Sequence, residues 1–438
     1  MNIREIPSKI LLLFLFFIFF TGVIGHISYL VGFSVIKLWK EFAIITLFAS
    51  VIFFRLPSIY KHTLIFIYGL GIFFILYLFN SLWLNITLII YQFKMDLIIF
   101  IFIIAAVDSL LMLKAEKYER TVKKIVKLII SLGFLNGCAI ILQRLFSHQF
   151  MNLVGFQSEQ WGMDIGIKIV ATGGHIRSMG LLTYFVPAGT LMLICLIILV
   201  ETRKYLNRSR KSFVFLFLFF TLSMIYTTYK TAIIGLMVYL FIKIIEKTFG
   251  IFKNIVITMF SLPLFLLFLV STHSYGINDF VAKYNAEMAY NSIFLRVVQH
   301  TAVINSMHTI KEFMFGKGAG YNGVFGLDKS VYGIDALALD STYIYLLSNY
   351  GFVFVFLFVI VMTYLIINFF KHKQYDIFGV RYLLFYTLFV EFFYNNFFTS
   401  YPTNVVIIVL TVAVIINKRR NLVYIKNIKK RDIIKKAA

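Results

Sequence analysis

Long apolar runs recur along the whole chain and restrict its fold more than any other feature. The 438 residues are 61% hydrophobic, with a mean hydropathy of +0.88, whereas soluble domains are nearer half apolar. Crossing about 30 Å of hydrocarbon takes about 20 helical residues, and runs of suitable length follow one another here. They are apolar on all sides, which favours helices over barrel strands. The sequence therefore predicts an all-α, polytopic integral membrane protein that forms one membrane domain over residues 1–438.

About twelve transmembrane helices are predicted from these runs. They lie near residues 10–33, 42–54, 63–79, 96–113, 128–146, 178–200, 212–227, 231–246, 254–270, 342–370, 382–398 and 404–417. The stretch Trp83–Tyr91 is interpreted as a separate interfacial or re-entrant piece. The first run follows Arg4 and Lys9 and extends over about 24 residues, which is too long for the core of a signal peptide. We therefore expect it to remain as a membrane span.

The distribution of positive charge sets the predicted orientation. The net charge is +23, and if the N-terminus is cytoplasmic, the predicted inner segments carry 30 of the 42 Lys and Arg residues and the outer segments 12. Such residues are retained on the cytoplasmic side during insertion. Both termini are therefore predicted to be cytoplasmic, including the basic tail 418–438, which could also approach anionic lipid heads. The charge needs no nucleic-acid partner to explain it.

Two predicted outward segments are long, residues 147–178 and 271–341. The second is the one large extracytoplasmic loop, and we expect it to carry helices at the membrane surface. Its stretch Tyr290–Phe315 is predicted as one such helix, with Arg296 and His300 four residues apart and therefore on one face.

A glycine-rich stretch, G-K-G-A-G-Y-N-G-V-F-G, follows at residues 316–326. It contains a literal G-x-G-x-x-G, but no strand precedes it, which excludes a dinucleotide-binding fingerprint. Glycine is accommodated where the backbone turns tightly or lies against another segment. The stretch is interpreted in one of these two ways.

Four basic residues lie on the predicted outer side, where such residues are disfavoured: Arg177, Lys230, Arg296 and His300. Arg177 is predicted to open the sixth span, and Lys230 lies in T-T-Y-K-T-A between two spans. Guanidinium and ammonium groups bind phosphate oxygens well, so a diphosphate lipid at the outer surface would be a natural ligand. The alternative is that these side chains anchor loops to lipid headgroups or pair with loop carboxylates.

Two carboxylates are candidate catalytic groups. Asp340 stands where the large loop returns to the membrane, and it could act as a base or hold a sugar hydroxyl. Alternatively, Asp340 or Ser341 caps the tenth span. Glu391 lies within the eleventh span, and an ionisable group at membrane depth is a functional candidate by default. The alternative is a carboxylate near the outer end of the span, hydrogen-bonded by the Tyr and Asn residues at 394–396.

No cluster of residues with metal-ligand spacing is present in the sequence, so neither a metal nor another cofactor is predicted. Cys138 and Cys195 fall inside predicted spans and are interpreted as packing residues. Asp108 lies near the inner end of its span and is expected to reach interfacial water.

Four short stretches occur in order between residues 170 and 370: I-R-S-M-G-L-L at 176–182, T-Y-K-T-A-I-I-G-L at 228–236, F-L-R-V-V-Q-H with F-M-F-G-K-G-A-G at 294–320, and D-S-T-Y-I-Y-L-L-S-N-Y-G at 340–351. In this order they resemble the R-x-x-G-L, S-R-x-A-x-x-G-L, R…G-x-G and H-N-x-x-L…G motifs of the bacterial O-antigen and exopolysaccharide polymerases (Wzy type) and the related O-antigen ligases. Lys230 stands in the basic place of the second motif.

The resemblance implies a metal-independent membrane glycosyltransferase, without a cofactor, in the bacterial cytoplasmic (inner) membrane. Its substrate would be an oligosaccharide repeat unit on undecaprenyl diphosphate at the outer face. Its product would be a surface polysaccharide such as O-antigen, capsule or exopolysaccharide. The family's partners, chain-length regulator and flippase proteins, would then be expected partners of this chain.

The resemblance also implies roles for the candidate residues. Arg177, Lys230 and Arg296 would bind the substrate diphosphate and stabilise the charge of the leaving group. A further group would position or deprotonate the acceptor hydroxyl. The candidates for this catalytic role are Asp340, His300 and Glu391.

Two other functions are alternatives. A flippase for lipid-linked oligosaccharides also has about twelve spans, but coupled carriers usually hold several intramembrane charges, and many transporters show two similar halves. The sequence shows neither feature. An O-antigen ligase would carry a His where this chain has Asp340 and an Asn where it has Ser341, which favours a polymerase.

Overall fold

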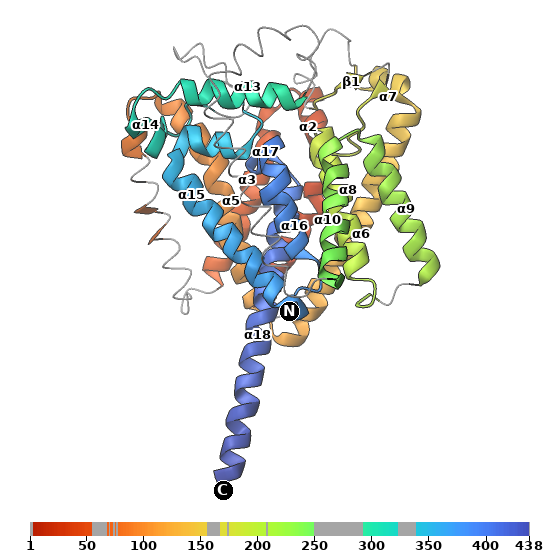
Figure 1. The fold of residues 1–438 in the computed structure, drawn as a ribbon. Helices are drawn as coiled ribbons and strands as arrows, with labels where there is room; N and C mark the ends of the chain where they lie inside the picture. The colour runs from red at the N-terminus through yellow and green to blue at the C-terminus, as the bar shows by residue number, and fades with distance from the viewer. Residues whose placement is uncertain are drawn as a thin grey trace.

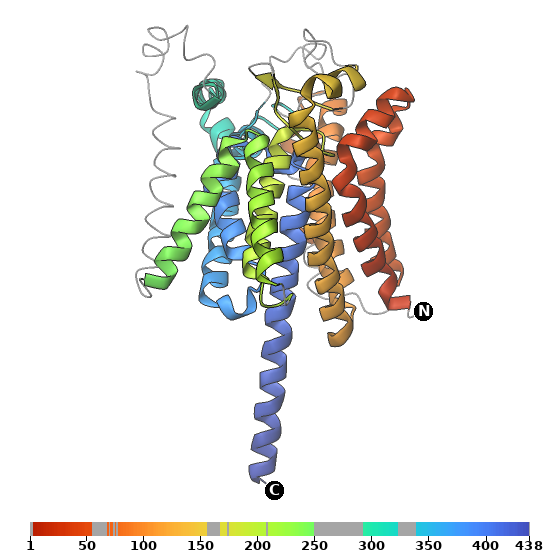
Figure 2. The ribbon, with the colours of Figure 1, turned by 90° about the vertical axis from the view of Figure 1, so that its right-hand side faces the viewer.

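The computed structural model describes residues 3–54, 68–69, 71–72, 75, 78–155, 167–172, 175–206, 209–248, 292–322 and 339–437. In this part of the chain the fold is helical except for a hairpin of two-residue antiparallel strands, β1 (Ala171–Thr172) and β2 (His175–Ile176). The longer helices run side by side as a bundle (Figures 1 and 2). The predicted all-α fold class is therefore confirmed for the described residues.

The helices of the bundle, in chain order, are α1 (Ile6–Phe17), α2 (Thr21–Leu30), α3 (Trp39–Phe53), α5 (Ile86–Leu111), α6 (Ala115–Leu145), α8 (Phe185–Glu201), α9 (Arg210–Tyr226), α10 (Lys230–Thr248), α15 (Thr342–Lys371), α16 (Val380–Tyr386), α17 (Phe392–Tyr394) and α18 (Thr403–Ala437). A π-helical segment, η7 (Thr387–Glu391), joins α16 to α17. Short 3-10 segments are η1 (Ile3–Glu5), η2 (Ile18–Phe20), η3 (Ser34–Leu38), η6 (Lys373–Tyr375) and η8 (Phe397–Thr399). One end of the bundle carries α7 (Ser147–Leu153), α13 (Ser292–Asn305) and α14 (Ile310–Phe315).

We call the end that carries α7, α13 and α14 the loop end, and the opposite end, where α1 begins and from which α18 projects, the terminal end (Figures 1 and 2). Among the described residues, four helical stretches are long and apolar enough to cross a membrane: Ile6–Leu30, Ile86–Leu111, Ala115–Leu145 and Thr342–Lys371. Helix α8 is apolar but shorter. The number of twelve spans and their sidedness stay predictions. The predicted span 254–270 and most of the span 63–79 lie outside the described residues.

Helix α8 lies at the centre of the bundle. Its residues from Phe185 to Leu199 are all buried, and it contacts α6, α9, α10, α16 and α18. A Cβ atom on Gly189 would lie 2.7 Å from Tyr229 Cβ, and one on Gly235 in α10 would lie 2.4 Å from the Tyr386 ring. Small residues allow helices in membranes to approach closely. These two glycines therefore bring α8, α10 and α16 into close contact.

Helix α15 consists of two parts that meet at a kink at Gly351 (φ 79°, ψ 172°). Almost only glycine adopts this conformation, and a Cβ atom here would lie 2.3 Å from the carbonyl oxygen of Met314. Residues 352–371 after the kink are enough to cross about 30 Å of hydrocarbon. Residues 341–350 before it are buried throughout, and we call them the buried segment 341–350.

Two predictions about helix boundaries were wrong. The helix predicted over Tyr290–Phe315 is two helices, because Thr309 begins α14 with a capping box that it shares with Glu312. The stretch Trp83–Tyr91 is not a separate piece, because α5 begins within it, directly after its N-cap Asn85. In both places a short polar capping residue decides where the helix starts.

Two predictions about single residues also need correction. Asp108 is only 2% exposed inside α5, so it does not lie in interfacial water. Arg177 does not open a span, because α8 begins only at Phe185 and the residues before it fold as a loop. Cys138 and Cys195 are free thiols inside α6 and α8, in line with their interpretation as packing residues.

The start of the glycine-rich stretch combines both predicted features. Gly316, Gly318 and Gly320 all have positive φ, so the backbone turns tightly there. A Cβ atom on Gly316 would lie 2.6 Å from the backbone of Asn349, and one on Gly320 would lie 2.7 Å from the carbonyl oxygen of Leu88. The glycines thus let this loop pack directly against α5 and the end of the buried segment 341–350.

Candidate functional site

Glu391 is 2% exposed and lies in η7, at the end of α16 that faces the loop end (Figure 1). Its Oε1 accepts hydrogen bonds from Thr190 Oγ1 at 3.0 Å and from Asn395 Nδ2 at 2.9 Å. Its Oε2 accepts from Tyr229 OH at 3.2 Å and from Tyr386 OH. We call these five residues the Glu391 hub. Because the donors come from α8, the turn before α10, α16 and the end of α17, one carboxylate joins all of these elements.

The π-helical turn that contains Glu391 redirects backbone carbonyl groups toward other partners. The Leu388 carbonyl accepts from Tyr343 OH at 2.5 Å, and the Phe392 carbonyl accepts from Ser341 Oγ at 3.0 Å. Carbonyl groups released from a regular helix need such partners where water is excluded. These bonds attach the start of the buried segment 341–350 to the Glu391 hub.

Asp340 immediately precedes Ser341, the first residue of the buried segment 341–350. Ser341 is the N-cap residue of α15, in line with the alternative interpretation of this stretch. Its side chain makes no capping bond, however, and donates to the Phe392 carbonyl instead. Asp340 is half-buried and interacts electrostatically with Lys168. Burial lowers the pKa of Lys168, and the negative charge of Asp340 partly offsets this effect. Asp340 is therefore a half-buried carboxylate in the electrostatic field of a cation, one residue before the N-cap of α15.

Arg177 fixes the turn that connects α9 to α10. Its Nε donates to Thr228 Oγ1 and its Nη2 to the Thr228 carbonyl, both at 2.8 Å. Its guanidinium carbon lies 3.6 Å from the centre of the Phe185 ring. Thr228 has a φ of 54°, an unusual value for a residue with a Cβ atom. The planar fork of Arg177 thus holds a strained turn in place.

This turn presents Lys230 at the loop end. Lys230 is exposed and is the first residue of α10, directly after Tyr229 of the Glu391 hub. The start of a helix carries a partial positive charge, so a Lys there is electrostatically unfavourable unless an anion is nearby. Backbone N–H groups at such an end also bind phosphate groups. The position of Lys230 therefore suits an anionic ligand.

Lys168 was missed by the sequence analysis, although it carries the same signal as Arg177, a basic residue in a predicted outer segment. Its backbone N–H donates to the Thr183 carbonyl at 2.8 Å, and its Nζ lies 4.6 Å from the centre of the Tyr184 ring. In the same loop, the backbone N–H of Arg177 donates to the Val170 carbonyl at 2.8 Å. Lys168 and Arg177 therefore belong to one folded loop.

Four of the six predicted site residues are thus brought together at the loop end. With the addition of Lys168 we call them the loop-end cluster: Lys168, Arg177, Lys230, Asp340 and Glu391. The other two predicted residues lie on α13, which crosses the loop end (Figure 1). His300 is 7% exposed there. Arg296 is placed only by the α13 backbone, because its side chain lies outside what the structure describes.

A second buried carboxylate, Asp96 on α5, was also missed. Its Oδ1 accepts from Tyr345 OH at 2.5 Å, and its Oδ2 accepts from Gln92 Nε2 at 2.8 Å and from Tyr350 OH. We call these four residues the Asp96 cluster. The predicted span 96–113 places Asp96 at its very start, where an acidic residue attracts no notice. The signal that could have revealed it is the spacing of Gln92 and Asp96, four residues apart on one helix face within an apolar run.

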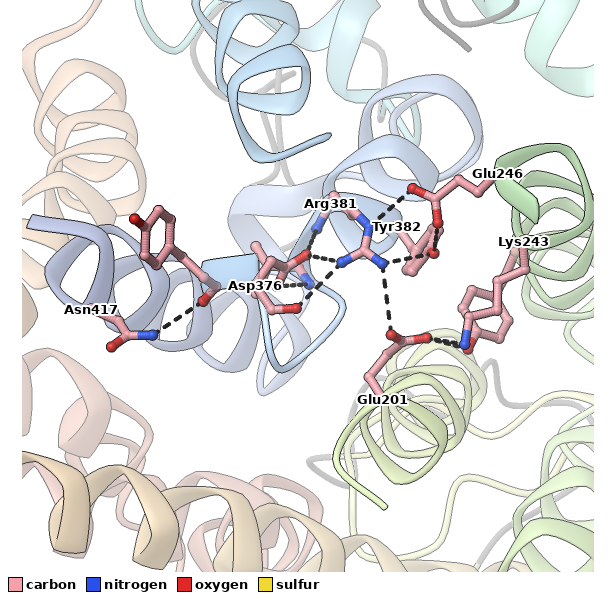
Figure 3. Close-up of polar contacts among 10 residues, drawn as sticks. Glu201, Lys243, Glu246, Asp376, Arg381, Tyr382 and Asn417 are labelled. Atoms are coloured by element: carbon pink, nitrogen blue, oxygen red, sulfur yellow. Dashed lines mark hydrogen bonds and ion pairs between the residues drawn. The ribbon is translucent and has the colours of Figure 1, made fainter. Parts of the chain in front are cut away.

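The terminal end holds a buried ion-pair network around Arg381 (Figure 3). The Arg381 guanidinium lies 2.9 Å from Asp376, 3.4 Å from Glu246 and 3.7 Å from Glu201. Lys243 pairs with Glu201 at 2.6 Å. Burial raises the pKa of the Asp376 carboxyl, and the positive charge of Arg381 opposes this shift. The network ties α8, α10 and α16 at the end opposite the Glu391 hub, which is a structural role.

Among the described residues, no group of three or more His, Cys, Asp or Glu side chains is arranged to hold a metal ion. Comparison of the chain with known protein families, with curated proteins and with solved structures found no match. The assignment of function therefore depends on the loop-end cluster and on the motifs that meet there.

Proposed function

We propose that this chain is a membrane glycosyltransferase that polymerises oligosaccharide repeat units carried on undecaprenyl diphosphate into a surface polysaccharide. The loop end would face the outside of the cytoplasmic membrane. One observation carries the proposal. Arg177, from the first stretch that resembles the polymerases, hydrogen-bonds Thr228 in the second, and Asp340 of the fourth interacts with Lys168 in the same folded loop as Arg177.

The cationic side of the cluster would bind the lipid diphosphate. Lys230 is exposed at the start of α10, and the turn fixed by Arg177 directs it. Diphosphate departure builds up negative charge on the leaving group, and preorganised cations stabilise such charge. In this account Lys230 contacts the phosphate oxygens, and Arg177 orients the turn as well as adding positive charge. Arg296 on α13 stays a candidate for the same task.

Asp340 would act on the acceptor sugar. Its carboxylate takes the proton of an acceptor hydroxyl while that oxygen bonds to the anomeric carbon of the donor chain. The bond from that carbon to the diphosphate oxygen breaks, and undecaprenyl diphosphate leaves with the bonding electrons. General base catalysis of this kind contributes about 10²–10⁴-fold to a rate. His300 on α13 is the alternative base at the same end.

Glu391 has a different role in this proposal. Both of its oxygens already accept two hydrogen bonds each, from Thr190 and Asn395 and from Tyr229 and Tyr386. A carboxylate accepts at about four lone-pair sites, so little capacity is left for a substrate proton. Glu391 is therefore assigned a positioning role. It holds Tyr229 in place, and the neighbouring Leu388 carbonyl holds the start of α15 through Tyr343.

Deletion of the gene followed by profiling of the surface glycan tests the proposal in cells. A polymerase mutant should display single repeat units, because transport and ligation continue without chain growth. Wild-type protein should restore long chains, and Asp340→Asn at normal abundance should not. Complete loss of surface glycan would instead identify a flippase. Accumulation of full-length polymer on its lipid carrier would identify a ligase.

A further inference from the structure

The buried segment 341–350 is held from two opposite sides. Tyr343 donates to the Leu388 carbonyl beside Glu391, whereas Tyr345 donates to Asp96 on α5. Two residues apart on a helix, these side chains point about 160° away from each other. The segment that begins directly after Asp340 is therefore fixed between the Glu391 hub and the Asp96 cluster.

Asp96 also fixes the rotation of this segment about its own axis. Tyr345 and Tyr350 are five residues apart, so their side chains leave the helix about 140° apart. Both hydroxyls nevertheless donate to the carboxylate of Asp96. A rotation of the segment would move at least one of the two hydroxyls out of reach. Gln92, which donates to Asp96 at 2.8 Å, orients the carboxylate from its own helix.

The hydrogen bonds to Asp96 fix the orientation of the buried segment 341–350 more narrowly than apolar packing alone would. A carboxylate inside an apolar helix is costly, and buried polar groups are tolerated when all of their hydrogen bonds are made. Here both oxygens of the Asp96 carboxylate accept hydrogen bonds, one from Tyr345 and the other from Gln92 and Tyr350. Hydrogen bonds are directional, whereas contacts between apolar side chains allow small rotations. The Asp96 cluster therefore specifies one orientation of the segment.

We propose that Asp96 is a positioning residue for glycosyl transfer, which acts by holding the buried segment 341–350 in the rotation that directs Asp340 toward the acceptor. The inference rests on the proposed function, because it depends on the role of Asp340. Asp96 touches neither substrate nor the reacting atoms. Its effect reaches the site through Tyr345, five residues from Asp340, and through Tyr350 at the kink.

Asp96→Asn is the first test, in a purified enzyme that extends lipid-linked repeat units. An Asn side chain whose oxygen faces Gln92 and Tyr350 turns its N–H₂ group toward Tyr345, whose hydroxyl already accepts from Gln92 Nε2, so this hydroxyl loses the acceptor that holds it. We expect kcat to fall about 10- to 100-fold, because small misplacements of catalytic groups have effects of this size, while KM for the lipid-linked donor changes less than about twofold. A rise in KM with unchanged kcat would overturn the proposal.

The double variant Asp96→Asn with Asp340→Asn separates positioning from a general loss of structure. If Asp96 acts through Asp340, adding Asp96→Asn to Asp340→Asn does not lower the rate further. The rates of the single and double variants are measured over long incubations. If the two losses multiply, Asp96 acts independently of Asp340 and the proposal is wrong. Independent sites give additive free energies, whereas residues that act as a unit do not.

Tyr118→Phe is the matched control for Tyr345→Phe. Tyr118 OH donates to the Ala413 carbonyl at 2.5 Å and is also buried, but it joins α6 to α18, away from the buried segment 341–350. Each variant removes one buried phenol hydroxyl, although the Tyr345 hydroxyl also accepts from Gln92 Nε2. We expect only Tyr345→Phe to lower kcat. An equal loss in Tyr118→Phe would show that any missing buried hydroxyl slows the enzyme.

A thiol-labelling measurement keeps this inference separate from the proposed function. Leu339, next to Asp340, is 3% exposed, so a Cys at 339 should react slowly with an impermeant thiol reagent. Adding Asp96→Asn should increase its reactivity as the segment rotates. Unchanged labelling would overturn the positioning role, even if the wild-type protein polymerises. Increased labelling in a protein that never polymerises would support the positioning and reject the proposed function.

Discussion

The two carboxylates near the loop end differ in how they are held, and this difference assigns their roles. Glu391 is enclosed and accepts four hydrogen bonds from three hydroxyls and one amide. Asp340 is half-buried, lies just outside α15 and interacts with a cation, Lys168. The second carboxylate is partly accessible, whereas Glu391 is 2% exposed. The sequence analysis could not rank them, because both were single acidic residues next to apolar runs.

Glu391→Gln should be mild and Glu391→Ala severe. The Gln oxygen can face Thr190 and Asn395 while its N–H₂ group faces Tyr229 and Tyr386, whose hydroxyls can turn to accept. In Glu391→Ala the hydroxyls of Thr190, Tyr229 and Tyr386 lose this acceptor, whereas Asn395 Nδ2 keeps its hydrogen bond to Ser400, and unsatisfied buried donors cost about 1–3 kcal/mol each. We expect Gln to retain more than about a tenth of the polymerisation rate. A loss of about 10²–10⁴-fold in a well-folded Gln variant would mean that Glu391 is the catalytic base.

Asp340→Asn should lower the pKa of Lys168 further. Burial depresses this pKa and the Asp340 charge raises it, so removing the charge leaves the burial effect unopposed. The Lys168 amine then loses its proton, and becomes reactive toward acylation, at a lower pH. The pH dependence of Lys168 acylation by an impermeant reagent, followed by mass spectrometry of the loop peptide, measures the shift. Identical profiles in both proteins would show that the two side chains do not interact.

At the scale of elements, α15 shows most clearly what the sequence could and could not reveal. Residues 342–370 were predicted as one span because they form a single apolar run. The run hides the kink, since Gly351 is flanked by Tyr and Phe and its positive φ depends on a close contact with Met314, 37 residues earlier. Contacts between distant segments leave no periodic pattern. The same reason explains why the Asp96 cluster was missed.

Gly351→Ala should be much more destabilising than Gly32→Ala. Both glycines have positive φ, 79° and 69°, but a Cβ atom on Gly351 would lie 2.3 Å from Met314 O, whereas nothing lies within 4 Å of one on Gly32. We expect a cost of about 1–2 kcal/mol for Gly32→Ala from backbone strain alone, and about 3 kcal/mol or more for Gly351→Ala. Thermal unfolding in detergent compares them. Equal midpoints of thermal unfolding for Gly351→Ala and Gly32→Ala would show that the kink at Gly351 is not tightly packed.

For the whole molecule, the sequence predicted the helical membrane class and several helices within a few residues, because apolar length is a local property. It also selected four residues of the loop-end cluster, from the rarity of basic and acidic groups between apolar runs. It could not show that α8, α10 and α16 are tied at both ends, by the Glu391 hub and by the Arg381 network. Those ties join side chains far apart in sequence, such as Glu201 and Arg381.

The orientation of the molecule is tested by single cysteines at Tyr321 and Lys429. Tyr321 lies beyond α14 at the loop end, and Lys429 lies in the part of α18 that projects from the terminal end (Figure 1). From the asymmetry of basic residues, an impermeant thiol reagent added to intact cells should label only the cysteine at 321. Labelling at 429 instead would invert the topology and place the loop-end cluster in the cytoplasm.

Purified protein in liposomes, supplied with repeat units on undecaprenyl diphosphate, tests the proposed glycosyl transfer in the absence of other enzymes. Chain length and released undecaprenyl diphosphate are measured together. A polymerase should produce a ladder of polymer and release one undecaprenyl diphosphate for each new glycosidic bond. If Asp340 is the general base, the rate of Asp340→Asn should be about 10²–10⁴-fold lower. Polymer formation at the wild-type rate by Asp340→Asn, or movement of the lipid across the membrane with no new glycosidic bond, would contradict the proposed mechanism.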